Sequence, residues 1–381
     1  MMDFPNFTIG VEEEYLLINR DTRSLREDPD PRFFADCETL GEGCVGHEFL
    51  RSQVEVGTRV CQSAAEVRTE LVRLRGLVHG VAQKYGLAIM AASTHPFARV
   101  IDQKHTAKAR YFALAEEMQA AARRMLICGM HVHVGVGDDD TRIDLMNQVA
   151  YFLPHLLALS ASSPYWEGED TGFRSFRTSV VSGLPRSGLP ARFASWGEYR
   201  RHVDMLIRNG LIEDTSKIWW DIRPSWRYPT LEVRVMDCCT SLDDAVCIAA
   251  LVQSLLRALW RLRAGNRQWR THADLLIQEN RWRAMRYGLE AGLLDLARGE
   301  IVSCQQLVDE LIDFVREDAL ELNCLAEVSH ARTILGRGTS AMRQRAVYAA
   351  ARSEHADHEN ALAHVVDWLV AETIAALPER A

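Results

Sequence analysis

The stretch FTIGVEEEYLLIN, residues 7–19, places three consecutive glutamates inside an apolar run. Val, Ile, Tyr, Phe and Thr favour strands, so the stretch predicts a β-strand. Side chains alternate between the two faces of a strand, so Glu12 and Glu14 share one face and Glu13 lies on the other. Two carboxylates about 7 Å apart repel each other and resist burial. The face therefore either binds cations or belongs to an edge strand that is solvated.

The composition is that of a soluble globular protein, with 48% hydrophobic and 25% charged residues in a chain of 381. A formal net charge of −8 argues against a nucleic-acid partner, which would need a basic face. We find no apolar run of the ~18 residues that span a bilayer, so we expect no membrane partner. The start, MMDFPNF, has neither a basic nor an apolar signal region, so no signal peptide is predicted.

The nine cysteines form an odd set with no CxxC pair, and Cys238 and Cys239 are adjacent. This spacing is typical of reduced, buried thiols and not of a disulfide framework or a zinc cluster. We therefore expect a cytoplasmic protein. Long amphipathic helices near the C-terminus could form an interface between copies of the chain, so the sequence allows a homo-oligomer.

Strands and helices mix along the chain without a regular βαβ alternation. The predicted helices are a capped one from Ser63 to Gly86, one around 107–127, an apolar one that contains Pro154, a capped one from Ser195 and a long one from Ser241. Residues 164–194 are rich in Gly, Pro and Arg and predict a long loop, and residues after about 266 read as almost entirely helical. We interpret residues 1–381 as a single catalytic domain, with a sheet-and-helix core over 1–265 and a helical part over 266–381.

Four short segments repeat the polar alternation of the first strand. VEEEY offers Glu12 and Glu14, RSQVEV offers Arg51, Gln53 and Glu55, MHVHVG offers His131 and His133, and LEVRV offers Glu232 and Arg234. In each segment the alternate residues are largely apolar and can pack on helices. The sequence thus predicts an α+β fold, in which an antiparallel β-sheet has a polar active-site face and helices pack on its other face.

The chemistry of these side chains indicates a metal site. Several carboxylates with one imidazole make a mainly oxygen site that suits Mg²⁺ or Mn²⁺. Magnesium commonly brings phosphates with it, and the guanidinium of Arg234 can bind a phosphate oxygen. Because the chain has neither a Walker P-loop nor GxGxxG, metals and arginines would have to hold a nucleotide. Each motif alone is weak evidence for a metal site. The prediction rests on the occurrence of the same polar alternation in four segments.

The sequence resembles the carboxylate–amine ligases of the glutamate–cysteine ligase type 2 group. The matching pieces are FTIGVEEEYLL, HEFLRSQVEVGT, ASTHPF, GMHVHVGV, LPHLLALSASSPYWEG, WDIRPS, TLEVRVMD and NRWRAMRYGLE, in order over roughly residues 7–290. The resemblance implies a six-stranded antiparallel sheet of the kind found in glutamine synthetase. It also implies ATP as a substrate and magnesium as the metal, with manganese as an alternative.

The resemblance further implies roles for individual residues. Glu14, Glu48 and Glu55 would hold one metal ion, and Glu12, His131 and Glu232 would hold the other. His133 would reach the ATP phosphates, Arg234 and Arg223 would act in catalysis, and Arg227 would bind phosphate or a substrate carboxylate. Arg174 and Arg177, in the 164–194 segment, are candidates for binding a substrate carboxylate. Glu13 is expected to be structural.

The implied activity is an ATP-dependent ligation that forms a γ-glutamyl amide, from glutamate and an amine such as cysteine, through an acyl phosphate. The 164–194 segment would close over that intermediate. Two alternatives remain open. One is a metal-dependent amide hydrolase, which would need no ATP. The other is a non-catalytic relative that binds nucleotide or metal.

Overall fold

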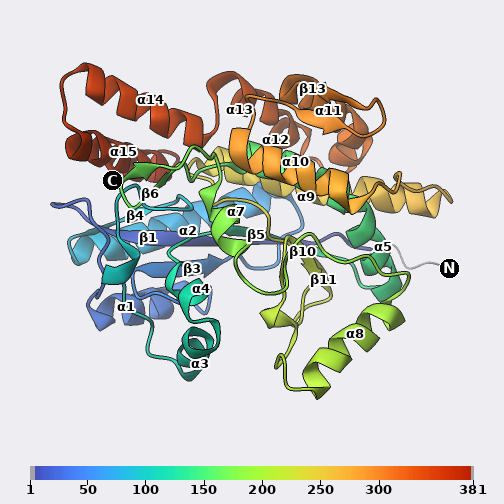
Figure 1. Cartoon of the computed structure of the whole chain (residues 1–381), viewed down its shortest axis with the longest axis horizontal. Helices are drawn as coiled ribbons and strands as arrows, with labels where there is room; N and C mark the ends of the chain where they lie inside the picture. The colour runs from blue at the N-terminus through green and yellow to red at the C-terminus, as the bar shows by residue number, and fades with distance from the viewer. Residues whose placement is uncertain (1–4, 379–381) are drawn as a thin grey trace.

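The computed structural model describes residues 5–378 (Figure 1). Residues 1–4, which carry part of the signal-peptide prediction, and residues 379–381 lie outside the described part. The strands of the main sheet are β1 (Ile9–Asn19), β2 (Val45–His47), β3 (Gln53–Gly57), β4 (Leu87–Met90), β5 (Met130–Gly135), β10 (Ile222–Pro224) and β11 (Thr230–Val233). Their order is β10-β11-β5-β1-β3-β2, and β4 pairs with β1 off this path.

The antiparallel sheet is confirmed, but it has seven strands where the family resemblance implied six. The additional pairing arises because β1 is long. Its first half, Ile9–Glu13, pairs with β5, and its second half, Leu16–Asn19, pairs with β4. The four polar segments identified in the sequence are β1, β3, β5 and β11, and these are neighbours in the sheet.

The register aligns the polar residues of these four strands. Glu12 lies opposite His131, and Glu14 lies opposite Glu55. Glu232 lies opposite His133 on one side and Arg223 on the other. The intervening residues of β1, β5 and β11 are buried, including Val11, Val132 and Val233, and belong to the hydrophobic core. One face of the sheet is therefore polar, as predicted.

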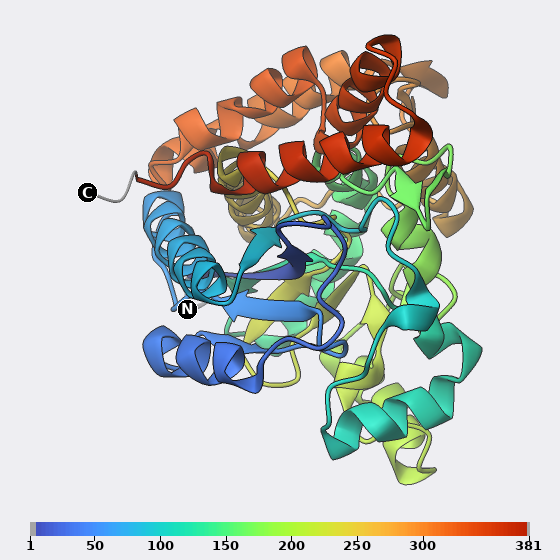
Figure 2. The same cartoon turned by 90° about the vertical axis from the view of Figure 1, so that its left-hand side faces the viewer.

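Residues 5–378 contain fifteen α-helices. They are α1 (Pro31–Gly41), α2 (Ala64–Lys84), α3 (Ala109–Met118), α4 (Ala120–Arg123), α5 (Asp139–Val149), α6 (Leu153–Ser160), α7 (Phe176–Val181), α8 (Trp196–Arg208), α9 (Leu242–Ala264), α10 (Asp274–Tyr287), α11 (Cys304–Glu321), α12 (Leu325–Ser329), α13 (Ala331–Arg337), α14 (Ser340–Ser353) and α15 (His358–Ile374). Helices α2, α5 and α9 pack against strands of the sheet. Helices α11–α15 gather on one side of the molecule, and α3 and α8 lie on the opposite side (Figures 1 and 2).

Several helix boundaries follow from local chemistry. The hydroxyls of Ser63 and Ser195 accept hydrogen bonds from the backbone N–H groups of Glu66 and Glu198, so both predicted caps are confirmed. The apolar helix around Pro154 is in fact two helices. A 3₁₀ turn, η2 (Ala150–Phe152), separates α5 from α6, and Pro154 occupies the first turn of α6, where its missing N–H is not needed.

Three predicted segments differ from the structure. The 164–194 stretch is not a continuous loop, because it contains α7, the pair β6 (Tyr165–Trp166) and β7 (Glu169–Asp170), and β8 (Ser187–Gly188), which pairs with β9 (Trp219–Trp220). The helix expected at 107–127 is broken at Gln119, whose φ is 47°. The C-terminal part also contains a hairpin of β12 (Leu293–Asp295) and β13 (Glu300–Val302).

Helix α9 is long and apolar enough, by length and composition, to cross a membrane. The prediction that no segment has this property is therefore wrong. In the structure, 78% of its most apolar window is buried, and the helix packs against α2, α5 and β5. Its hydrophobicity thus matches its place in the core, where both faces of the helix are covered.

Glu13, in the middle of the opening acidic run, lies on the apolar side of the sheet and is fully buried. The guanidinium of Arg75 on α2, also fully buried, donates two hydrogen bonds to its carboxylate, at 2.6 and 3.0 Å. The hydroxyl of Tyr15 donates a third, at 2.6 Å. Arg75 also donates to three backbone carbonyls, those of Cys239, Thr240 and Thr373. A buried charge is retained here because every polar group of the cluster has a partner.

Replacement of Glu13 should destabilise the fold strongly. We expect Glu13→Gln to lower the free energy of unfolding by about 3–5 kcal/mol, because the change leaves the Arg75 charge buried without its counter-ion. Urea denaturation followed by circular dichroism measures the effect. The control is Asp313→Asn, which removes the exposed pair with Arg316 and should cost less than about 1 kcal/mol. Equal losses in the two variants would contradict this account.

Candidate active site

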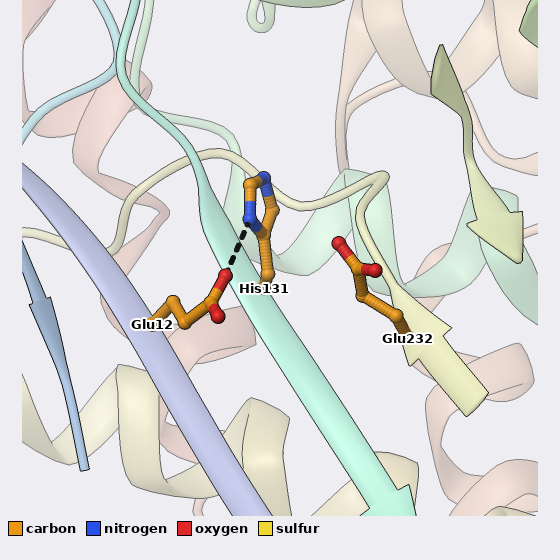
Figure 3. Close-up of side chains that lie close together, drawn as sticks. All are labelled: Glu12, His131 and Glu232. Atoms are coloured by element: carbon orange, nitrogen blue, oxygen red, sulfur yellow. Dashed lines mark hydrogen bonds and ion pairs between the residues drawn. The ribbon is translucent and has the colours of Figure 1, made fainter. Parts of the chain in front are cut away.

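Three ligand side chains from three adjacent strands converge on the polar face of the sheet (Figure 3). Glu12, His131 and Glu232 each place one ligand atom within 4.8 Å of the others. In the part of the chain that the structure describes, this is the one group of three that converges so closely. The Nδ1 atom of His131 lies 3.2 Å from a carboxylate oxygen of Glu12. This arrangement agrees with the predicted ligand set of one metal ion.

Two arginines hold Glu232 in place. Nε and Nη2 of Arg223 donate to its two carboxylate oxygens, at 2.9 and 3.2 Å, and Arg234 forms an ion pair with the same group. Burial opposes the carboxylate charge, but Arg234 and Arg223 outweigh it and lower the pKa of Glu232. Glu232 is therefore ionised and preoriented toward Glu12 and His131.

The two histidines of β5 are in different states. Burial, together with the charge of Arg234, lowers the pKa of His131 to about 4, so its imidazole is neutral and able to ligate a metal. His133 has Nδ1 3.0 Å from the hydroxyl of Thr230 and Nε2 3.4 Å from Glu12. Burial opposes its charge, but hydrogen bonding to Glu12 and the charge of Glu232 raise its pKa. His133 thus adds a second imidazole, with a raised pKa, beside the three ligands.

The second predicted ligand set, Glu14, Glu48 and Glu55, lies further along the same face. Glu14 comes from β1, Glu55 from β3, and Glu48 follows β2. Burial and the charge of Glu48 raise the pKa of Glu14 to about 8, and burial and the other carboxylates raise the pKa of Glu55 well above its usual value. Burial also raises the pKa of Glu48. These carboxylates repel one another, and their ligand atoms do not converge as the first set does.

A small cavity of about 110 Å³ adjoins both ligand sets. Its polar lining includes Glu14, Glu48, His131, Arg177 and Arg234. Its apolar lining includes Trp219, Trp220, Val181 and Leu184. The cavity therefore lies where a small carboxylic acid could meet both arginines beside the acidic face.

Arg177 reaches this cavity from α7. The side chain is buried, with Nη2 3.2 Å from the carbonyl oxygen of Arg234 and Nε without a hydrogen-bond partner in the described chain. It lies against Gly129, where a Cβ atom would come within 2.5 Å of Nη2. The Gly129 N–H donates to Glu14 at 2.7 Å. The absence of a side chain at residue 129 therefore permits Arg177 to sit beside Glu14.

Three other arginines lie away from the three convergent side chains, and Arg223 is engaged by the protein itself. Arg174 donates to Glu290 at 2.6 Å, which directs its guanidinium away from the metal ligands. Arg227 is exposed in the turn between β10 and β11. Arg51 precedes β3 and pairs with Asp28, so its expected place on the polar face is wrong. Arg223 is buried, and its Nη1 donates to three backbone carbonyls, so its guanidinium is fully used by the protein.

Two groups of residues beside the cavity were not assigned from the sequence. Arg281 donates to Asp221 through Nε and Nη2, at 2.5 and 3.0 Å, and both side chains line the cavity. Asp237 is buried and accepts from Ser163 and Ser175, which fixes the chain just before Arg177. Asp221, Arg281 and Asp237 occur in the quoted motifs WDIRPS, NRWRAMRYGLE and TLEVRVMD. These motifs contain all three residues, but no sequence pattern indicated which side chains they would pair with.

The donor set fits a hard divalent cation. Its atoms are carboxylate oxygens with one neutral imidazole nitrogen, and no thiol lies among them. The mutual repulsion of Glu14, Glu48 and Glu55 would be relieved by a cation between them. Mg²⁺ and Mn²⁺ both suit this chemistry better than Zn²⁺ does.

The acidic, arginine-bearing face of the sheet fits a metal-dependent enzyme with anionic substrates, and comparison with known proteins identifies its class as that of the ATP-dependent carboxylate–amine ligases. The model of the family described as glutamate-cysteine ligase family 2 matches residues 8–366, so the chain belongs to this family. A protein of Rhodospirillum rubrum with the provisional name glutamate–cysteine ligase 2 is 56% identical, over 98% of this chain and 97% of the relative. A protein of Paracoccus denitrificans with the same provisional name is 49% identical, over 98% and 99%.

Solved structures share the fold at much lower identity. The glutamate–cysteine ligase of Francisella tularensis, in complex with AMP, superposes with a TM-score of 0.68 at 14% identity, over 99% of this chain and 91% of that one. The bifunctional glutathione synthetase of Pasteurella multocida gives a TM-score of 0.68 at 17% identity, over 97% and 53%. At these identities the likeness concerns the fold alone.

The metal site can be tested without any substrate. We expect Mn²⁺ to bind the purified protein, and Glu12→Gln and Glu232→Gln each to weaken this binding by about tenfold or more, because each removes a charged ligand. Titration followed by electron paramagnetic resonance counts the free ion. The control, Glu290→Gln, changes a carboxylate that pairs with Arg174 and should bind Mn²⁺ like the unmodified protein. Unchanged affinity in both ligand variants would contradict the assignment.

Proposed function

We propose that this protein forms a γ-glutamyl amide from glutamate and an amine, such as cysteine, at the expense of ATP. In the first step an oxygen of the γ-carboxylate attacks the γ-phosphorus of ATP, which gives an acyl phosphate and ADP. In the second step the amine nitrogen attacks the carbonyl carbon, and inorganic phosphate leaves as the amine loses a proton. Activation is required because a carboxylate oxygen is otherwise a poor leaving group.

The observation that carries this proposal is the position of Arg234. Its guanidinium pairs with Glu232, lies 3.4 Å from Nδ1 of His131, and lines the cavity that also contains Arg177. It therefore stands between the convergent metal ligands and the place for a small acid. A phosphoryl group that passes from nucleotide to acid would cross this position.

The remaining residues fit the same separation between a region for metal ions and nucleotide and a region for the acid substrate. Glu12, His131 and Glu232 would hold one Mg²⁺, and Glu14, Glu48 and Glu55 the other. When bound, Mg²⁺ would supply neutralisation of phosphate charge. His133 is proposed to face the ATP phosphates. Arg223 anchors Glu232 through its saturated hydrogen bonds, so we assign it a positioning role.

The buried surroundings of the cavity favour transfer of the acyl group to the amine over hydrolysis of the acyl phosphate. Trp219, Trp220, Val181 and Leu184 form an apolar wall, which limits the access of water to a reactive acyl phosphate. Helix α7 and the turn after it provide Val181 and Leu184 of this wall, and α7 also carries Arg177. We propose that both substrates are small molecules and that the enzyme acts in the cytoplasm.

The proposed reaction is tested by ADP release. We expect rapid ADP formation only when ATP, Mg²⁺, glutamate and an amine are all present, with a panel of amino acids as the amine. Arg234→Gln should lower kcat by about 10³-fold, because it removes the charge nearest the transferring phosphoryl group. A coupled assay for ADP, together with chromatography of the amide, measures both products.

The matched control for this assay is Arg298→Gln, which removes a surface pair with Glu310 and should leave kcat unchanged. Cleavage of amides without ATP would favour the hydrolase instead. Full activity of the Arg234 variant would exclude its proposed role.

A second test concerns the acid substrate. We expect Arg177→Ala to raise KM for glutamate by about tenfold or more, with a smaller change in KM for ATP, because one charge-assisted hydrogen bond to a carboxylate contributes about 1.5–3 kcal/mol. Gly129→Ala should act in the same direction, since its Cβ would displace the guanidinium. Arg174→Ala is the comparison and should have little effect. Steady-state kinetics with unchanged KM in the first two variants would refute the assignment.

A further inference from the structure

The carboxylate of Asp237, in the segment that follows β11, is fully buried and is held by neutral donors. Its Oδ2 accepts from the backbone N–H of Ser162 at 2.9 Å and from the hydroxyl of Ser163 at 2.7 Å. Its Oδ1 accepts from the hydroxyl of Ser175 at 2.7 Å. Burial of a carboxylate is costly unless its oxygens are hydrogen-bonded, so this network is what allows Asp237 to occupy the interior.

Two of these serines connect Asp237 to the first turn of α7. The backbone N–H of Arg177 donates to Oγ of Ser163 at 3.1 Å. Ser175 is the residue before α7, and its Oγ lies 2.7 Å from Oγ1 of Thr178. Because Ser175 gives its single hydroxyl proton to Asp237, Thr178 is the donor in this second bond. Asp237 therefore holds the start of α7 at two points.

The guanidinium of Arg177 has few firm contacts of its own. Its Nη1 lies 3.4 Å from the carbonyl oxygen of Val235, and its Nη2 lies 3.2 Å from that of Arg234. These are long distances for hydrogen bonds, and an arginine that binds a substrate must keep donors free. The position of this side chain thus depends on the backbone that carries it, which is the part that Asp237 anchors.

Asp237 also supports the surface beneath that guanidinium. It lies opposite Gly129 in an isolated antiparallel bridge, and Gly129 is the residue against which Arg177 packs. Burial raises the pKa of Asp237, and the charge of Arg177 opposes this rise. The two charges are therefore close enough to interact, and one carboxylate is linked to both the backbone and the packing surface of Arg177.

We propose that Asp237 is a positioning residue for the acid substrate. It fixes the first turn of α7, so that the guanidinium of Arg177 remains directed into the cavity before the substrate arrives. Asp237 is absent from the residues that line the cavity, so it acts through Arg177 and touches no reacting atom. The identity of the acid as glutamate rests on the proposed function.

The kinetic test uses Asp237→Asn, which removes the charge and keeps the size of the side chain. We expect KM for glutamate to rise by about tenfold, while kcat and KM for ATP change by less than about twofold. In the double variant with Arg177→Ala, KM for glutamate should equal that of Arg177→Ala alone, because Asp237 acts only through Arg177. Steady-state ADP release measures all three constants.

Two further variants keep this test decisive. Ser163→Ala retains the carboxylate but removes the acceptor of the Arg177 N–H, so it should also raise KM for glutamate, even if Asp237→Asn does not fold. The matched control is Asp295→Asn. Asp295 is also buried and accepts from the backbone N–H groups of Ala297 and Arg298, at 2.8 and 3.0 Å, in the β12–β13 hairpin. Its replacement should leave KM for glutamate unchanged, whatever it costs in stability.

Hydrogen exchange tests the anchoring without turnover. We expect the backbone amides of residues 174–181 to exchange about tenfold faster in Asp237→Asn and in Ser163→Ala, because the start of α7 opens more often. The amides of α2 should exchange as they do in the unmodified protein. Mass spectrometry of peptides from the labelled full-length chain measures both regions.

The proposal fails if both variants retain the KM for glutamate of an active unmodified enzyme. It also fails if the effect of Asp237→Asn adds to that of Arg177→Ala, or if exchange in α7 is unaltered. An unmodified protein that releases no ADP with glutamate and any amine would refute the proposed function instead. The exchange measurement would then still decide whether Asp237 anchors α7.

Discussion

The buried ion pair between Glu13 and Arg75 sets the register on which the rest of the sheet depends. Because a strand alternates its faces, a slip of one residue in β1 would bring Glu12 and Glu14 into the core and expose Glu13. The Glu13 carboxylate accepts two hydrogen bonds from Arg75 on α2 in its present position, and it would lose both in the slipped one. The pair thus determines that Glu12 and Glu14 face the catalytic side.

The polar face of the sheet contains two contrasting electrostatic environments. Around Glu232, arginines already compensate the charge, so the carboxylate is ionised and held in one orientation. Around Glu14, Glu48 and Glu55, burial and mutual repulsion raise the pKa values. Arg234 influences both environments. The first is preorganised by the arginines of the protein, whereas in the second the arginines compensate the carboxylates only in part.

Alternation along strands predicted that Glu12, His131 and Glu232 share one polar face, because each lies in a regular strand, and the family resemblance grouped them as one ligand set. Alternation could not place Glu48, which follows β2 outside any strand, and only the family resemblance indicated that residue. The pattern also failed for Arg177, since the stretch that carries it reads as a loop and folds as α7. The partner of Asp221 is 60 residues away, and no periodicity relates two such distant side chains.

The contact between Arg75 and the carbonyl of Thr373 joins residues 298 positions apart in the chain. During synthesis, Arg75 leaves the ribosome long before its last acceptor exists, although Glu13 and α2 are already available. The hydrogen bonds of this buried guanidinium are complete only after α15 has been made and has docked. A chain that lacks α15 therefore leaves one hydrogen bond of this buried guanidinium unmade, although its charge is already paired with Glu13.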